Sequence, residues 1–163
     1  MIAPDSFYTG MVCLNGHEVT DRLEDLTARA APYCSQCGEP TISSCPKCDA
    51  PVRGDYQPPR GYAHVLRKYR APLYCDNCGA PYPWTERRLD AARQLIDESA
   101  LEDGEKETLK GTVEALTRDT AETPLATVKY KRLASKLGSE GLAALKSILV
   151  SVATEAVRRE LFS

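Results

Sequence analysis

The sequence lacks the features that mark several large classes of protein. No apolar run reaches the roughly 18 residues of a membrane-spanning helix, so we expect no membrane span. The first residues lack the basic and apolar segments of a secretory signal, so we expect none. The formal net charge is -2, and acidic and basic residues balance in both halves. No overall basic field therefore predicts nucleic-acid binding.

The sequence also has few of the patterns that accompany catalysis. It holds only two histidines, and it has neither a Gly-rich phosphate-binding loop nor the H-E-x-x-H pattern of a zinc protease. The sequence contains no recognisable motif that pairs a catalytic nucleophile with a general base. We therefore expect a protein that is not an enzyme.

Cysteine, by contrast, is abundant and regularly spaced. All seven cysteines and one histidine form four two-residue sets, which are Cys13/His17, Cys34/Cys37, Cys45/Cys48 and Cys75/Cys78. An odd number of cysteines argues against a closed disulfide framework, and C-x-x-C pairs are typical of metal sites in a reducing compartment. We therefore expect a cytoplasmic, metal-binding protein.

Eight nitrogen and sulfur ligands are enough for two tetrahedral sites, one with three cysteines and a histidine and one with four cysteines. Catalytic zinc keeps an open position, and neither set provides one. The sequence therefore predicts two structural Zn²⁺ ions per chain, with zinc preferred over iron. Structural zinc supplies about 10–16 kcal/mol of binding free energy coupled to folding. A segment rich in proline and loops needs such a contribution, because it has little apolar material for a core.

Two pairings of the four sets are open. Sequential pairing joins the first set with the second and the third with the fourth, whereas interleaved pairing joins the first with the third and the second with the fourth. We favour sequential pairing because Gly38 to Ser44, only seven residues, separate the two halves, and because the histidine belongs to the first set.

A short repeat surrounds the three C-x-x-C pairs. After the second cysteine come Gly or Asp, then any residue, then Pro; the copies are Cys34 to Pro40, Cys45 to Pro51 and Cys75 to Pro81. A tight turn that brings two sulfurs to one ion commonly needs positive φ after the second cysteine. We therefore expect positive φ at Gly38, Asp49 and Gly79, with a short strand at each proline.

Composition changes near Trp84, where the cysteines and most prolines end and Leu, Ala, Glu, Lys and Arg become frequent. The predicted fold is a small metal-stabilised α+β protein. Residues 8–84 form two tandem zinc ribbons of short β-hairpins and knuckles, and residues 85–163 form a four-helix region. Periodicity and caps predict the helices at about 86–99, 103–118, 123–137 and 140–161.

Several side chains in the helical region have predicted roles. Thr85 is the expected N-cap of the first helix, and Trp84 is expected to pack that helix against the last knuckle. Leu125, Val128, Leu133 and Leu137 are expected on the buried face of the third helix. The apolar stripe of the last helix predicts closure of a bundle, with a homo-oligomer contact as the alternative.

Residues 60–70 interleave basic and aromatic side chains. Candidate contacts to the phosphates and bases of a nucleic acid are Arg60, Tyr62, Arg67, Lys68, Tyr69 and Arg70. A solvated hairpin whose tyrosines lean on the ribbon is the favoured alternative.

The motifs resemble those of a bacterial family of unknown function that begins with a double zinc ribbon. The matching segments are Cys13-Leu14-Asn15-Gly16-His17, Tyr33 to Gly38, Cys45 to Cys48, Pro51 to Tyr56, Tyr74 to Gly79, Pro83-Trp84-Thr85-Glu86 and Thr123 to Ala126. The resemblance implies a prokaryotic cytosolic protein with paired ribbons and a helical tail, and it implies no activity.

The leading hypothesis is a non-enzymatic adaptor that binds a protein partner, with Arg53-Gly54-Asp55-Tyr56 as one candidate surface. A turn in which Arg53 or Asp55 supports the ribbon is the alternative for that segment. Nucleic-acid binding through residues 60–70 is the second hypothesis for the whole chain. A non-catalytic subunit of an enzyme complex is the third.

Overall fold

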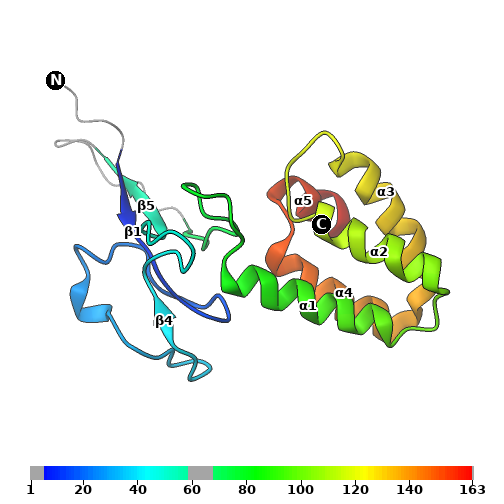
Figure 1. Cartoon of the computed structure of the whole chain (residues 1–163), viewed down its shortest axis with the longest axis horizontal. Coiled ribbons are helices and arrows are strands. Elements are labelled where there is room, and N and C mark those ends of the chain that lie inside the picture. The colour runs from blue at the N-terminus through cyan, green and yellow to red at the C-terminus, as the bar shows by residue number, and fades with distance from the viewer. Residues whose placement is uncertain (1–5, 59–67, 163) are drawn as a thin grey trace. The chain divides into compact units, whose positions relative to one another are not determined.

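The computed structural model describes residues 6–58 and 68–162. The chain forms two compact units that divide between Thr85 and Glu86. Short antiparallel strands and loops make up the N-terminal unit, and helices make up the C-terminal unit (Figure 1). This arrangement confirms the predicted small α+β fold.

The described residues of the N-terminal unit form five short strands. β1 (Ser6–Thr9) pairs antiparallel with β5 (Arg53–Gln57), and the pair forms a two-stranded sheet. The second sheet has the order β3 (Glu18–Thr20), β2 (Met11–Cys13) and β4 (Thr41–Ile42), also antiparallel. A single 3₁₀ turn, η1 (Thr27–Arg29), lies in the connection between β3 and β4.

The Arg53-Gly54-Asp55-Tyr56 segment belongs to strand β5 and is not a turn. Gly54 is required there because a Cβ would lie 2.2 Å from the carbonyl oxygen of Asp21. The Asp55 N–H donates to that same carbonyl. Arg53 forms an ion pair with Asp76 at 2.6 Å, which ties β5 to the last knuckle.

The core of the N-terminal unit is small and includes two of the ligand-type cysteines, Cys45 and Cys75. Its buried members are Val12, Cys45, Val52, Cys75, Tyr82 and Trp84. The Trp84 ring stacks on Tyr82 with 4.5 Å between centroids and 9° between planes. Its indole Nε1–H donates to the carbonyl of Pro72 at 2.9 Å. The expectation that Trp84 packs on the last knuckle is therefore confirmed.

Helix α1 (Pro83–Asp97) begins earlier than the sequence predicts. Proline suits a first helical position because it has no N–H to satisfy. Thr85 therefore lies inside the first turn, and its prediction as an N-cap is wrong. Its buried hydroxyl donates instead to the carbonyl of Leu73 at 2.7 Å.

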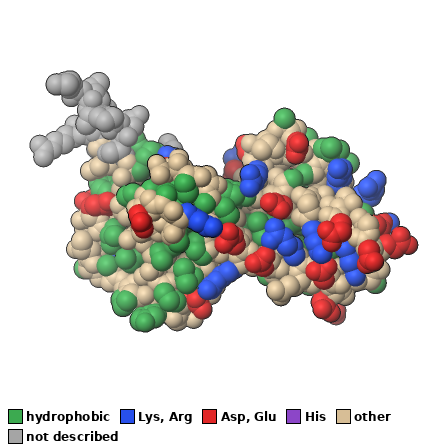
Figure 2. Space-filling model, viewed as in Figure 1, with side chains coloured by type: hydrophobic (Ala, Val, Ile, Leu, Met, Phe, Trp, Pro, Cys, Tyr) green, Lys and Arg blue, Asp and Glu red, His purple; other side chains and the backbone are tan. Residues whose placement is uncertain are grey.

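Four further helices complete the C-terminal unit. They are α2 (Asp103–Ala115), α3 (Thr123–Ala134), α4 (Gly138–Val152) and α5 (Glu155–Phe162), with a 3₁₀ turn η2 (Ser135–Leu137) before α4. Figure 2 shows acidic and basic side chains interspersed on one face of these helices. No helix in the described ranges is long and apolar enough to cross a membrane.

The predicted last helix, about 140–161, is divided into α4 and α5 at Ala153 and Thr154. Ala153 is extended, with φ -69° and ψ 149°. The break lets the Thr154 N–H donate to the Leu116 carbonyl at 3.2 Å, while the Thr154 hydroxyl accepts from the Val157 N–H. A capping threonine and a long-range hydrogen bond thus end one helix and start the next.

The buried face of the third helix is predicted only in part. Leu133 is buried and Leu137 is half-buried, but Leu125 and Val128 are exposed, at 57% and 63% of their surface. The buried residues of α3 are Thr123, Ala126, Thr127, Tyr130, Leu133 and Ala134. Thr127 is tolerated inside because its hydroxyl donates to the Thr123 carbonyl.

Candidate metal centres

The eight ligand-type side chains gather into two clusters. One contains Cys13, His17, Cys34 and Cys37, and the other contains Cys45, Cys48, Cys75 and Cys78. Within each cluster the ligand atoms lie within 4.8 Å of one another, and all seven cysteines are free thiols. The chain therefore groups its ligand sets in sequence order, as in the sequential pairing that we favour.

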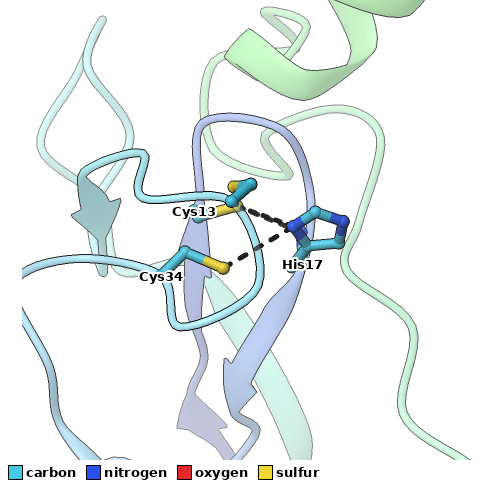
Figure 3. A group of neighbouring side chains, drawn as sticks. Cys13, His17 and Cys34 are labelled. Atoms are coloured by element: carbon cyan, nitrogen blue, oxygen red, sulfur yellow. Dashed lines mark hydrogen bonds between the residues drawn. The ribbon is translucent and has the colours of Figure 1, made fainter.

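The first cluster is sized for a tetrahedral ion. An ion with sulfur at about 2.3 Å and nitrogen at about 2.0–2.1 Å holds two sulfurs about 3.8 Å apart, and sulfur and nitrogen about 3.6 Å apart. Cys13 Sγ lies 3.8 Å from Cys37 Sγ. The sulfurs of Cys13 and Cys34 each lie 3.6 Å from His17 Nδ1, and both point toward the imidazole ring (Figure 3).

The second cluster has the same dimensions. Cys45 Sγ lies 3.8 Å from Cys78 Sγ, and Cys48 Sγ lies 3.7 Å from Cys75 Sγ. These edges match those of a tetrahedron of four sulfurs around one ion. Both clusters are thus compatible with one metal ion each.

Local backbone geometry positions the sulfurs identically in the three C-x-x-C knuckles. In each, the backbone N–H of the first cysteine donates to the carbonyl of the residue five positions later. These bonds join Cys34 to Glu39, Cys45 to Ala50 and Cys75 to Ala80, all at 2.8 Å. The backbone N–H of the residue after the second cysteine donates to the carbonyl of the first cysteine. These bonds join Gly38 to Cys34, Asp49 to Cys45 and Gly79 to Cys75, at 2.8–2.9 Å. The sequence repeat is therefore a structural repeat.

The predicted positive φ angles are confirmed in all three copies. They are 74° at Gly38, 59° at Asp49 and 71° at Gly79. The prolines that follow form isolated antiparallel bridges with Tyr33, Ser44 and Tyr74. The first ligand set closes differently, because Gly16, with φ 85°, precedes the histidine.

Hydrogen-bond donors around the sulfurs favour the thiolate form that a metal requires. The backbone N–H of Gln36 lies 3.4 Å from Cys34 Sγ and lowers the pKa of that thiol. The backbone N–H of Cys78 lowers the pKa of Cys75 to about 6. Burial acts the other way at Cys13, where it raises the pKa.

Asn77 is a contributor that the sequence analysis missed. Its side-chain amide donates to Cys48 Sγ at 3.4 Å and lowers the pKa of that thiol. Asn77 lies between the cysteines of the last knuckle, so its contact crosses from one knuckle to the other. The variable positions inside a C-x-x-C pair were the signal that could have pointed to it.

The residues predicted to contact nucleic acid are only partly described. Arg60, Tyr62 and Arg67 lie outside the described residues. Lys68 and Arg70 are exposed. Tyr69 packs over Gly10, and its hydroxyl donates to the Arg53 carbonyl at 2.8 Å, as in the favoured alternative in which the tyrosines lean on the ribbon.

Comparison with known families decides where the chain belongs. The family model described as "Uncharacterized protein conserved in bacteria (DUF2321)" matches residues 6–161. The chain belongs to this bacterial family. The match confirms the resemblance seen in the motifs and spans both units. No curated protein and no solved structure matches the chain.

Proposed function

We propose that this member of the family is a non-enzymatic adaptor, held in shape by two structural Zn²⁺ ions, that binds a protein partner through its N-terminal unit. The observation that carries the proposal is the closure of both clusters, because eight metal-type ligands form two complete sets of four. A tetrahedral ion in such a set has no position left for a substrate. Zinc is the ion proposed because both donor sets are those of structural zinc sites.

The proposed contact surface is the β1–β5 patch, made of Phe7, Arg53 and Tyr56. Phe7 and Tyr56 lie opposite each other on the two strands, with ring centroids 5.8 Å apart. They are 45% and 38% exposed, and the Arg53 guanidinium carbon lies 4.3 Å from the Phe7 centroid. Aromatic residues and arginine are enriched where proteins contact each other.

The patch is also held rigidly, which lowers the entropic cost of binding. The two strands fix Phe7 against Tyr56, and the ion pair with Asp76 fixes Arg53. Because Asp76 lies in the last knuckle, the patch depends on the second cluster. Metal removal should therefore abolish partner binding as well as order in the knuckles.

The test is photo-crosslinking in the bacterial host with a photoreactive amino acid in place of Phe7 in the full chain. A partner at the patch gives one discrete adduct, which disappears when Tyr56→Ser is added. Val150, 41% exposed on α4, is the matched control position. Equal crosslinking at both positions, or none in place of Phe7, would contradict the proposal. An enzyme recovered in the adduct would make the chain a non-catalytic subunit of its complex.

Nucleic-acid binding is a second candidate. The exposed Lys68 and Arg70 flank Tyr69 in the chain, and the Tyr69 hydroxyl donates to the Arg53 carbonyl of β5, the strand that also carries Tyr56. Cations that flank a strand with an exposed aromatic ring suit a single-stranded nucleic acid. Fluorescence anisotropy with a single-stranded oligoribonucleotide tests it. Binding should weaken with salt and in Lys68→Ala/Arg70→Ala, but not in the control Lys131→Ala/Arg132→Ala. No binding at low salt rules this candidate out.

A further inference from the structure

Two apolar side chains of the C-terminal unit lie in solvent on one face of α3. Leu125 and Val128 are three residues apart, so they lie next to each other on the helix surface. More than half of each side chain is exposed. An exposed pair of large aliphatic residues is informative when it adjoins a hollow, because such surfaces mark interaction sites.

Leu125 lines a groove of about 460 Å³ between α2 and α3, which run side by side (Figure 1), whereas Val128 lies outside its lining. Small residues line it, namely Gly111 and Ala115 on α2 and Ala126 on α3. A Cβ built on Gly111 meets nothing within 4 Å, so the hollow continues over α2. Small residues of this kind let a second helix approach closely.

Three charged residues line the groove, namely Glu107, Glu122 and Lys129, and Glu107 forms an ion pair with Lys110 at 2.9 Å. Glu122 and Lys129 both line it, seven residues apart, which is about 10 Å along a helix. Their midpoint falls between Leu125 and Ala126. Within the described part of the chain, neither Glu122 nor Lys129 forms an ion pair.

We propose that a second copy of this chain binds this α2–α3 face, defined by Gly111, Glu122, Leu125, Val128 and Lys129. A two-fold dimer needs a surface that complements itself. If two α3 helices cross antiparallel near Leu125, the apolar residues of each copy enter the groove of the other. The same crossing sets Glu122 of each copy opposite Lys129 of the other, so the opposite charges meet twice.

The proposed dimer does not depend on the proposed adaptor function, but it would give the adaptor a second binding unit. A dimer built through the C-terminal units carries two N-terminal units. Two linked binding units bind a repeated or oligomeric partner more tightly than one unit does. Dimerisation and partner binding are measured separately, so the failure of one leaves the other standing.

The first test is sedimentation equilibrium of the metal-loaded full chain over a wide range of concentration. The wild type should show a mass of two chains that falls to one chain on dilution. Leu125→Glu and Val128→Glu should each raise the dissociation constant about tenfold or more, because each places a charge in an apolar contact. Val150→Glu, on α4 and also exposed, should leave it unchanged.

The second test uses the charge pattern, which a non-specific association would not obey. Glu122→Lys alone sets two lysines opposite each other, and Lys129→Glu alone sets two glutamates opposite each other. Each variant should therefore be a monomer by itself, whereas an equimolar mixture should form a heterodimer. Circular dichroism of each variant checks that the helices remain folded.

Four outcomes would overturn the inference, and the first three concern the proposed face itself. They are a monomer at every concentration, a dimer that Leu125→Glu leaves intact, and a mixture of the charge variants that stays monomeric. A dimer that Val150→Glu weakens as strongly as Leu125→Glu would also overturn it, because the contact would then lie elsewhere.

Discussion

The backbone conformation of one residue in each C-x-x-C knuckle shapes the two ligand clusters. Gly38, Asp49 and Gly79 follow the second cysteine of their knuckles, and all three have positive φ. Glycine reaches this region freely, whereas an ordinary L-residue pays roughly 1–2 kcal/mol. Aspartate is one of the few alternatives tolerated there, which explains why the repeat accepts Gly or Asp.

Gly79→Ala should lower the free energy of unfolding of the metal-loaded N-terminal unit by about 1–2 kcal/mol. No atom lies within 4 Å of a Cβ built at Gly79, so the loss comes from the backbone and not from a clash. Gly104→Ala is the matched control, because its surroundings are equally open but its φ is not positive. Urea denaturation measures both. A Gly79→Ala variant as stable as the wild type would show that the turn geometry is relaxed at little cost.

The ligands were predictable from the sequence because their arrangement is local. Two cysteines with two residues between them share one ion only through a tight turn. The spacing of Cys75 and Cys78 therefore predicts a metal site without any long-range information. Asn77 was not predictable in this way. Its amide reaches Cys48, twenty-nine residues away, and only the meeting of two knuckles creates that contact.

At the scale of elements, long-range hydrogen bonds decide where α1 begins. Local propensity favours Thr85 as a cap, but Trp84 and Thr85 donate to the carbonyls of Pro72 and Leu73, twelve residues back. Burial of both side chains outweighs the local preference, and the helix starts at Pro83. The sequence pattern contains no sign of these partners.

Trp84→Phe should therefore lower the free energy of unfolding of the N-terminal unit by about 1–3 kcal/mol. The change leaves the half-buried Pro72 carbonyl without its indole donor and removes part of the ring that stacks on Tyr82. Chemical denaturation, followed by far-ultraviolet circular dichroism, measures the loss. Tyr33→Phe, which alters an exposed ring, is the control; an equal effect in both variants would argue against a role for the indole hydrogen bond.

Apolar periodicity does not fully predict which face of a helix is buried, as α3 shows. Counting apolar residues placed Leu125 and Val128 inside, whereas α3 buries Thr123 and Thr127. These threonines are acceptable inside because their hydroxyls are hydrogen-bonded. Periodicity identified the helix and the burial of Leu133 correctly, but it placed Leu125 and Val128 on the wrong face. That difference revealed the exposed pair on the α2–α3 face.

At the scale of the whole molecule, we expect the two units to depend on metal to different degrees. The N-terminal unit has short strands and a core cluster of six buried residues, two of which are cysteines of the second cluster. The C-terminal unit buries apolar residues from all of its helices, including Leu109, Leu145 and Leu149. Structural zinc contributes about 10–16 kcal/mol to small domains of the first kind.

Chelation of the metal should therefore unfold the N-terminal unit and leave much of the C-terminal unit folded. Hydrogen exchange followed by mass spectrometry should show that the knuckle amides lose protection, while amides of α2 and α4 keep theirs. Restoring Zn²⁺ should restore protection in the knuckles. Unchanged protection across the knuckles after chelation would contradict a structural role for the metal.

The most direct test of the central claim is the metal content of the full chain, measured by native mass spectrometry. Two closed structural sites predict two zinc ions per chain. Cys78→Ser should bind only one ion tightly, because it removes a ligand from the second cluster and leaves the first intact. A chain that binds no zinc, or that loses both ions together in Cys78→Ser, would contradict two independent zinc centres.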